Sequence, residues 1–140
     1  MEQRILKAAC YCRLSEDDLN DGTSISIETQ ITIAKQYCKT NRIEIVDFYC
    51  DDGYTGTNFE RPAFKRMIGD IEKGKVDTVV VKVLSRFGRE SIKVNYYTQM
   101  FFPETNINFI IIADNTVITA NSTYDDRLSS QVQQNQRKNL

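Results

Sequence analysis

The stretch Asp77-Thr78-Val79-Val80-Val81-Lys82-Val83-Leu84 decides the fold class of this chain. Its continuous run of valines is typical of a strand at the centre of a parallel sheet, because such a strand is covered on both faces. Ser85 and the motif Arg86-Phe87-Gly88-Arg89 follow directly. The stretch therefore predicts a buried central strand with arginines just beyond its carboxyl end.

Strands and helices alternate on both sides of this central strand. The order predicts an α/β domain over residues 1–118, built as a three-layer open sheet, mostly parallel, with helices on both faces. Residues 119–140 are polar and fit either a marginal helix or a disordered tail. Residues 51–58 are dense in turn formers and predict a loop. The predicted strands are residues 4–12, 43–48, 77–84 and 107–113, and the predicted helices run from Ser24 or Ser26 to Thr40, from Pro62 to Gly74 and from about Glu90 to Phe102, with Pro103 ending the third.

The composition fits one domain without a metal or nucleotide site. The chain has 140 residues, no histidine and a formal net charge of -1, whereas a free-standing DNA-binding domain usually carries a basic surplus. Its four cysteines form no Cys-x-x-Cys pair, and we expect reduced thiols in a cytoplasmic protein. There is no signal peptide, no apolar run long enough to span a bilayer and no glycine-rich phosphate loop after a strand. The sequence therefore predicts no cofactor.

The most informative motif for function is Tyr11-Cys12-Arg13-Leu14-Ser15, at the end of the first predicted strand. Residues two apart in a strand point to the same side, so the Ser15 hydroxyl and the Arg13 guanidinium can face one point. A Ser-His-Asp hydrolase is excluded, because the chain has no histidine. A serine hydroxyl among arginines instead suggests attack on a phosphodiester.

Arginines suit this chemistry because a planar guanidinium makes paired hydrogen bonds to phosphate and stays protonated. In open α/β sheets, sites form at the carboxyl ends of the strands. Ser15, Asp52 and Arg86 each follow the end of a different predicted strand. An isolated arginine is more often a surface charge, but the convergence of separate motifs on one edge weakens that interpretation. The candidate phosphate-binding residues are Arg13, Arg61, Arg86 and Arg89.

Several other residues near this edge leave two interpretations open. Asp51 and Asp52 fit a general acid or base or a metal site, and they equally fit two turn residues. Gln30 fits either a hydrogen bond to the site or a solvent-facing position. The aromatic residues fit core or subunit contacts better than base-stacking platforms, and they are Tyr54, Phe59, Phe87, Tyr96, Tyr97, Phe101 and Phe102.

Four groups of motifs occur in order along the chain: Tyr11-Cys12-Arg13-Leu14-Ser15, Ile27-Glu28-Thr29-Gln30, Asp52-Gly53-Tyr54-Thr55-Gly56 with Glu60-Arg61-Pro62, and Leu84-Ser85-Arg86-Phe87-Gly88-Arg89. Together they resemble the catalytic domain of serine recombinases, the resolvase/invertase superfamily. Their spelling is closest to the large-recombinase branch carried by transposons and integrative elements. The resemblance covers about residues 4–114.

The resemblance implies a site-specific DNA recombinase that needs neither metal nor nucleotide. Family members attack DNA with a serine and form a 5′-phosphoserine link and a free 3′-hydroxyl. Four subunits exchange the cut ends and reseal them. Ser85 stands where many resolvases have aspartate, which leaves the identity of a general acid open. Carried over residue by residue, the nucleophile is Ser15, the phosphate-binding arginines are Arg13, Arg61, Arg86 and Arg89, and the supporting polar residues are Gln30, Asp52 and Thr55.

The resemblance also implies partners, namely DNA attachment or resolution sites and further copies of the chain, as a dimer and as a tetramer in the active complex. Family members continue into an oligomerisation helix and DNA-binding domains, whereas residues 115–140 match poorly, so we expect the DNA-binding domains to be absent here. Two other hypotheses stay open: a catalytically silent remnant that acts as a dimerisation module, and a flavodoxin- or receiver-like binding domain. Ser15 and the arginines favour the recombinase.

Overall fold

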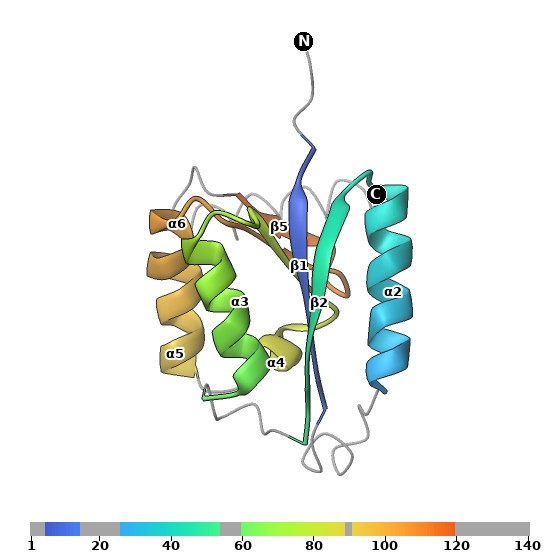
Figure 1. The fold of residues 1–140 in the computed structure, drawn as a ribbon, viewed down its shortest axis with the longest axis horizontal. Coiled ribbons are helices and arrows are strands. Elements are labelled where there is room, and N and C mark those ends of the chain that lie inside the picture. The colour runs from blue at the N-terminus through green and yellow to red at the C-terminus, as the bar shows by residue number, and fades with distance from the viewer. Residues whose placement is uncertain (1–4, 15–25, 54–59, 89–90, 120–140) are drawn as a thin grey trace, which may run out of the picture.

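A computed structural model of the chain describes residues 5–14, 26–53, 60–88 and 91–119. These residues form a five-stranded sheet in the order β2-β1-β3-β4-β5 (Figure 1). The first four strands are parallel, and β5 is antiparallel to β4, which confirms the predicted mostly parallel sheet. The strands are β1 (Lys7–Leu14), β2 (Glu44–Asp52), β3 (Thr78–Val81), β4 (Asn108–Ile111) and β5 (Thr116–Ile118).

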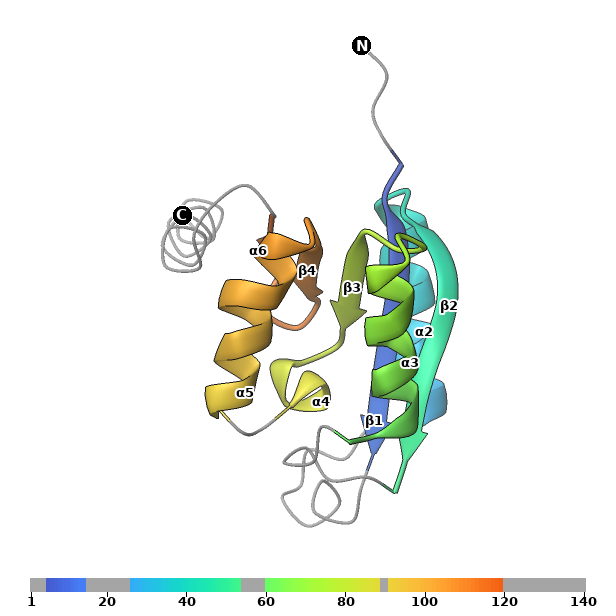
Figure 2. The same cartoon turned by 60° about the vertical axis from the view of Figure 1, so that its left-hand side comes forward.

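Helices cover both faces of the sheet, as predicted. The connection from β1 to β2 and the connection from β2 to β3 run across the sheet in opposite directions. Because such crossovers are right-handed, they put α2 on one face and α3 on the other (Figures 1 and 2). We call these the α2 face and the α3 face. The helical segments are α2 (Ile27–Thr40), α3 (Pro62–Glu72), α4 (Leu84–Phe87), α5 (Ser91–Tyr96), the π-helical turn η1 (Tyr97–Phe101) and α6 (Phe102–Glu104).

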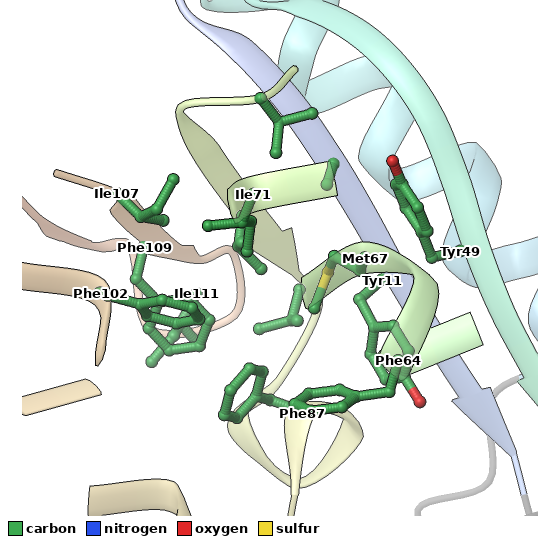
Figure 3. Packing of buried hydrophobic residues seen from close by; sticks show 14 of the residues in the cluster. Tyr11, Tyr49, Phe64, Met67, Ile71, Phe87, Phe102, Ile107, Phe109 and Ile111 are labelled. Carbon is green, nitrogen blue, oxygen red and sulfur yellow. The ribbon is translucent and has the colours of Figure 1, made fainter. Parts of the chain in front are cut away.

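The two faces have different cores. The α3 face contains an aromatic core in which Phe87 lies between Phe64 and Phe109, with ring centroids 5.5 and 5.0 Å away (Figure 3). The core of the α2 face is made of smaller side chains, which are Ala8, Cys10, Ala34, Cys38, Val80 and Ile110. β1 supplies both cores, because alternate residues of a strand point to opposite faces.

Three predicted helix boundaries are confirmed by the caps. The Ser26 hydroxyl accepts a hydrogen bond from the Thr29 N–H and caps α2. Pro62 occupies the first turn of α3, where its missing N–H has no intrahelical role. Gly74 follows the last residues of α3 with φ +75, a left-handed conformation that glycine adopts without strain.

The first two strands are longer at their carboxyl ends than the sequence predicts. β1 continues through Leu14 and β2 through Asp52, because these two residues are still paired across the ladder. Asp51 and Asp52 therefore belong to a strand, and the prediction of a loop from residue 51 was wrong at this point. Pairing with a neighbouring strand outweighs the turn preference of aspartate.

The later elements also differ from the predicted ranges. β3 and β4 are shorter than 77–84 and 107–113, because their pairing stops at Val81 and Ile111, and α4 begins at Leu84. The short strand β5, which follows β4 in an antiparallel direction, was not predicted. Pro103 does not end the third helix. In the turn η1 the hydrogen bonds join residues five apart, so that the Phe102 N–H binds the Tyr97 carbonyl. Pro103 then lies in the first turn of α6, where a residue needs no N–H partner.

Candidate active site at the carboxyl edge of the sheet

The predicted site lies at the carboxyl ends of β1, β2 and β3. In the order β2-β1-β3, the chain changes direction across the sheet at β1, and ligands of open α/β sheets bind outside the strand ends at such a switch point. Arg13 is the penultimate residue of β1, Asp52 is the last residue of β2, and Arg86 lies in α4, just after β3. The fold therefore brings three motifs, which are far apart in sequence, to one edge.

Arg13 is completely buried and binds the segment that follows β3. Its Nε donates to the carbonyl oxygen of Arg86 at 3.3 Å, and its Nη2 donates to the carbonyl oxygen of Ser85. Backbone carbonyls near the end of a short helix carry partial negative charge, so a guanidinium is a suitable partner for them. The Arg13 side chain thus fixes α4 against the end of β1.

Gln30 reaches from α2 to the backbone of Arg13. Its Nε2 donates to the Arg13 carbonyl at 2.9 Å, and its Oε1 accepts from the Arg13 N–H at 3.2 Å. β3 pairs with β1 only up to Cys10, so beyond that residue one edge of β1 has no strand beside it. The buried Gln30 amide replaces the missing ladder at this position. Gln30 therefore does not face solvent, and its role in the predicted site stays a prediction.

Arg61 is also completely buried and joins three elements. Its Nη1 donates to the Tyr11 hydroxyl at 2.8 Å, and its Nη2 donates to the Phe87 carbonyl at 2.8 Å. Its guanidinium carbon lies 4.8 Å from the ring centroid of Phe64 and 5.3 Å from that of Tyr11, within the range of cation–π attraction. Burial lowers the pKa of Arg61, although a guanidinium remains protonated at neutral pH.

Asp51 provides the N-terminal cap of α3 from a neighbouring strand. The cap position of α3 is occupied by Arg61, whose side chain makes no capping bond. Instead, the Asp51 carboxylate accepts hydrogen bonds from the N–H groups of Ala63 and Phe64, at 2.9 and 3.0 Å. A carboxylate also suits the positive end of the helix dipole. This arrangement leaves the Arg61 side chain available for the interior.

The same carboxylate accepts a third hydrogen bond, from the Tyr11 hydroxyl at 2.8 Å. Burial is the main cause that raises the pKa of Tyr11, and the bond to Asp51 adds to it, while the charge of Arg61 acts in the opposite direction. Tyr11 therefore stays neutral, and its hydroxyl donates to Asp51 while its oxygen accepts from Arg61. The sequence pointed to Asp51 only as an acid, base, metal ligand or turn residue, and it gave Tyr11 no role.

A signal for this network was nevertheless present in the sequence. An arginine directly before Pro62 is a poor helix cap, so a cap from another segment was to be expected. Tyr11 stands two residues before Arg13, so both side chains point to the α3 face. What the sequence did not give is the identity of the strand that supplies the cap.

Arg86 is completely buried in α4, and Ser85 beside it is half-buried. The carbonyl groups of Ser85, Arg86 and Phe87 all accept hydrogen bonds from Arg13 or Arg61. Arg13 and Arg61 thus bind three consecutive carbonyls of α4, the short helix that carries Arg86. This convergence is the main geometric feature of the site.

Asp52 is exposed at the end of β2, directly across the ladder from Leu14. Three other predicted site residues, Ser15, Thr55 and Arg89, lie outside the described residues. Within the described ranges, no group of three or more cysteine or acidic side chains is arranged to hold a metal ion. Asp51 is occupied by three hydrogen bonds instead, and Asp52 is separated from it by the pleat of the strand.

Two further observations concern the cysteines and the helices. All four cysteines are free thiols, of which Cys50 is exposed. In the part of the chain that the structure describes, no helix has the length and apolar character needed to cross a membrane.

Comparison with known proteins identifies the family. The model of the resolvase N-terminal domain matches residues 8–138. The N-terminal catalytic domain of TP901-1 integrase superposes with a TM-score of 0.75 at 29% identity, over 95% of this chain and 96% of that one. A resolvase family site-specific recombinase from Streptococcus pneumoniae gives a TM-score of 0.68 at 29% identity, over 96% and 89%.

A third solved structure, the C-terminal catalytic domain of ISC1926 TnpA, an IS607-like serine recombinase, shares the fold with a TM-score of 0.63 at 21% identity, over 76% of this chain and 67% of that one. A comparison with curated protein sequences finds no match. The family match covers the site motifs from Tyr11 onward and extends beyond residue 118, where the domain boundary remains a prediction. The chain therefore belongs to the resolvase family and is a serine recombinase catalytic domain.

Proposed function

We propose that this domain cuts and rejoins DNA at specific sites through a covalent phosphoserine intermediate, with Ser15 as the nucleophile. The Ser15 oxygen attacks the scissile phosphorus and releases its proton, the bond from phosphorus to the 3′-oxygen of the neighbouring nucleotide breaks, and that oxygen takes up one proton and leaves as a 3′-hydroxyl. One phosphodiester is exchanged for another. Reverse attack by a 3′-hydroxyl reseals the strand, so the reaction consumes no nucleotide.

The arginines are assigned to the phosphate. In the transition state, negative charge grows on the non-bridging oxygens, and fixed cations stabilise it most when they need no rearrangement. We assign Arg86 and Arg89 to direct contact with these oxygens. Arg13 and Arg61 contribute positive charge and fix α4 in place. Gln30 supports Arg13, and we assign Asp52, Thr55 and Ser85 to supporting contacts around the phosphate.

The observation that carries this proposal is the binding of the α4 carbonyls by Arg13 and Arg61. Buried guanidiniums are costly to desolvate, and a fold retains them where their geometry is used. Three buried guanidiniums lie at the edge where ligands of such sheets bind, and they belong to Arg13 in β1, Arg61 at the start of α3 and Arg86 in α4. Resolvase-family membership gives that ligand as DNA.

We further propose that the domain acts as a dimer that pairs into a tetramer on two DNA sites, and that it works in the cytoplasm. A recombinase must cut four strands, and one such domain holds one nucleophile. The formal net charge of -1 indicates that other protein segments supply most of the DNA affinity. Four free thiols fit a reducing compartment.

Trapping of a covalent adduct tests the proposal. The chain is joined to a sequence-specific DNA-binding domain and mixed with duplexes that carry two inverted binding sites around a randomised, nicked centre. Loss of the short strand after the nick prevents resealing, so the adduct accumulates. We expect a protein–DNA band that survives denaturation and whose phosphopeptide contains Ser15.

The Ser15→Ala variant is the control, because it removes one oxygen and keeps the charge of the site. It should bind the duplex as the parent does and form no adduct. A covalent band that persists in Ser15→Ala would overturn the assignment of the nucleophile. A folded parent that binds the duplex without forming any adduct would support the alternative of a catalytically silent dimerisation module. The family match does not favour the flavodoxin- or receiver-like alternative.

A further inference from the structure

The carboxylate of Asp51 has more partners than a helix cap requires. It accepts two N–H groups from the first turn of α3 and, in addition, the hydroxyl of Tyr11. Asp51 is 3% exposed and is the single buried carboxylate among the described residues. The Asp51 carboxylate therefore binds both the first turn of α3 and the Tyr11 hydroxyl in the interior of the site edge.

The Tyr11 hydroxyl connects this carboxylate to Arg61 through two hydrogen bonds. A hydroxyl has one proton to donate, and here the Tyr11 hydroxyl donates it to Asp51 Oδ2, with 2.8 Å between the two oxygens. The oxygen lone pairs are then directed to Arg61 Nη1, also at 2.8 Å. An ionised carboxylate can only accept, so it fixes the direction of the whole chain of hydrogen bonds. An amide at position 51 cannot do so, because its NH2 would face an N–H of α3 or the donating hydroxyl.

Arg61 extends the chain to α4. Its second nitrogen, Nη2, binds the Phe87 carbonyl, next to Arg86. The rings of Tyr11 and Phe64, which meet edge to face at 5.7 Å, lie under the same guanidinium. The hydrogen bonds and the two rings together thus hold the guanidinium in place.

We propose that Asp51 and Tyr11 are positioning residues for DNA cleavage, acting through Arg61 on the α4 segment that carries Arg86. The inference rests on the proposed phosphoserine chemistry. It adds a role for Tyr11, to which the motif containing it assigned none, and for Asp51, which lies outside the quoted motifs. Neither residue needs to touch DNA. Their effect is on the rate of the chemical step, because a displacement of a phosphate-binding arginine by 1 Å is enough to slow such a step by about 100-fold.

Tyr11→Phe separates this role from the capping of α3. The substitution keeps the aromatic ring at position 11 in contact with Phe64 and Arg61. It removes the hydroxyl that joins Asp51 to Arg61. Asp51 keeps both N–H groups of the helix. Asp51→Asn, by contrast, disturbs the cap as well as the chain. The matched control is Tyr49→Phe, which removes another tyrosine hydroxyl bonded to an aspartate, Asp70. The arginine over the Tyr49 ring is Arg66, which is not one of the predicted site residues.

The experiment measures the single-turnover rate of adduct formation at saturating protein, using the chain joined to a DNA-binding domain and the nicked duplex. We expect Tyr11→Phe and Asp51→Asn each to slow adduct formation by about 10- to 100-fold, and Tyr49→Phe to cleave at the parent rate. Binding of the duplex, measured in the Ser15→Ala background, should not change. The double variant should be no slower than Asp51→Asn alone, since both act through one chain of bonds.

Two outcomes would overturn the inference while leaving the nucleophile intact. One is a Tyr11→Phe variant that forms the adduct at the parent rate. The other is a pair of effects that multiply in the double variant, which would mean that the two residues act independently. A parent chain that forms no adduct contradicts the proposed function itself, so the two failures are distinguishable.

Discussion

The α3 face and the α2 face of one sheet differ in what they bury. On the α3 face, Arg61, Tyr11 and Asp51 lie among large aromatic rings, and the hydrogen bonds between them join different elements. On the α2 face, the core consists of alanine, cysteine, valine and isoleucine. Strand β1 contributes to both, since Cys10 points one way and Tyr11 the other. The difference shows how a single strand can contribute to an apolar core on one face and to a network of buried polar side chains on the other.

The comparison has an energetic side. Buried charges lose hydration, and they are tolerated only where several hydrogen bonds replace it. The α3 face supplies these bonds from the carbonyls of α4 and the Tyr11 hydroxyl. We therefore expect substitutions on the α3 face to change both stability and DNA cleavage, and substitutions in the α2 face to change mainly stability.

The largest effect is expected for Phe87→Ala. The Phe87 ring contacts Phe64, Phe102 and Phe109 edge to face, and its removal leaves a cavity between them. Urea denaturation should show a loss of about 3–5 kcal/mol in the free energy of unfolding. Ile110→Val in the α2 face should lose only about 0.5–1.5 kcal/mol. Equal losses for the two variants would contradict the difference between the cores.

The next effect concerns cleavage. Arg86→Ala removes a buried guanidinium from α4, and we expect the rate of adduct formation to fall by about 10²- to 10³-fold. The control is Arg42→Asn, which removes an exposed arginine beyond the other end of the sheet, where asparagine tolerates the φ of 57. A similar loss of rate in Arg42→Asn would indicate a general effect of charge on DNA binding.

Gln30→Leu tests the contact that joins α2 to the backbone of Arg13. The substitution leaves the N–H and the carbonyl of Arg13 without their side-chain partner, and a buried unsatisfied polar group costs about 1–3 kcal/mol. Chemical denaturation should detect this loss, and adduct formation should slow with it. Gln36→Leu, on the exposed side of the same helix, should change the free energy of unfolding by less than about 0.5 kcal/mol. A fully stable Gln30→Leu variant would show that the Arg13 backbone finds another partner.

The smallest effect is expected at the exposed rim of the α3 face. The hydrogen bond from Arg66 lowers the pKa of Asp47. A pKa below its unfolded value gives stability that is present above about pH 4 and is lost as the pH falls through the folded value. Because both side chains are about half exposed, with 48% and 52% of their area accessible, the gain is below about 1 kcal/mol. Asp47→Asn should therefore be slightly less stable than the parent at pH 7, and the difference should shrink as the pH falls below about 4. A difference that grows toward acid would contradict this pair.

The sequence by itself determined the order of the elements and the chemistry of the motifs. The valines of β3, the start of α2 at Ser26 and the position of Pro62 follow local rules of burial and capping, and the structure confirms them. The arginines were also recognisable, because a residue type that binds phosphate was repeated after separate strands. These features depend on neighbours in the chain, which a sequence displays directly.

Only the tertiary structure decided how the polar residues are connected. Asp51 is a turn former by local preference, yet pairing of β2 with β1 keeps it in a strand and places it at the first turn of α3. Gln30 completes a strand edge only because β3 stops pairing with β1 at Cys10. Contacts of this kind join residues 12 to 73 positions apart, and their free energy depends on distances that local sequence preference does not contain.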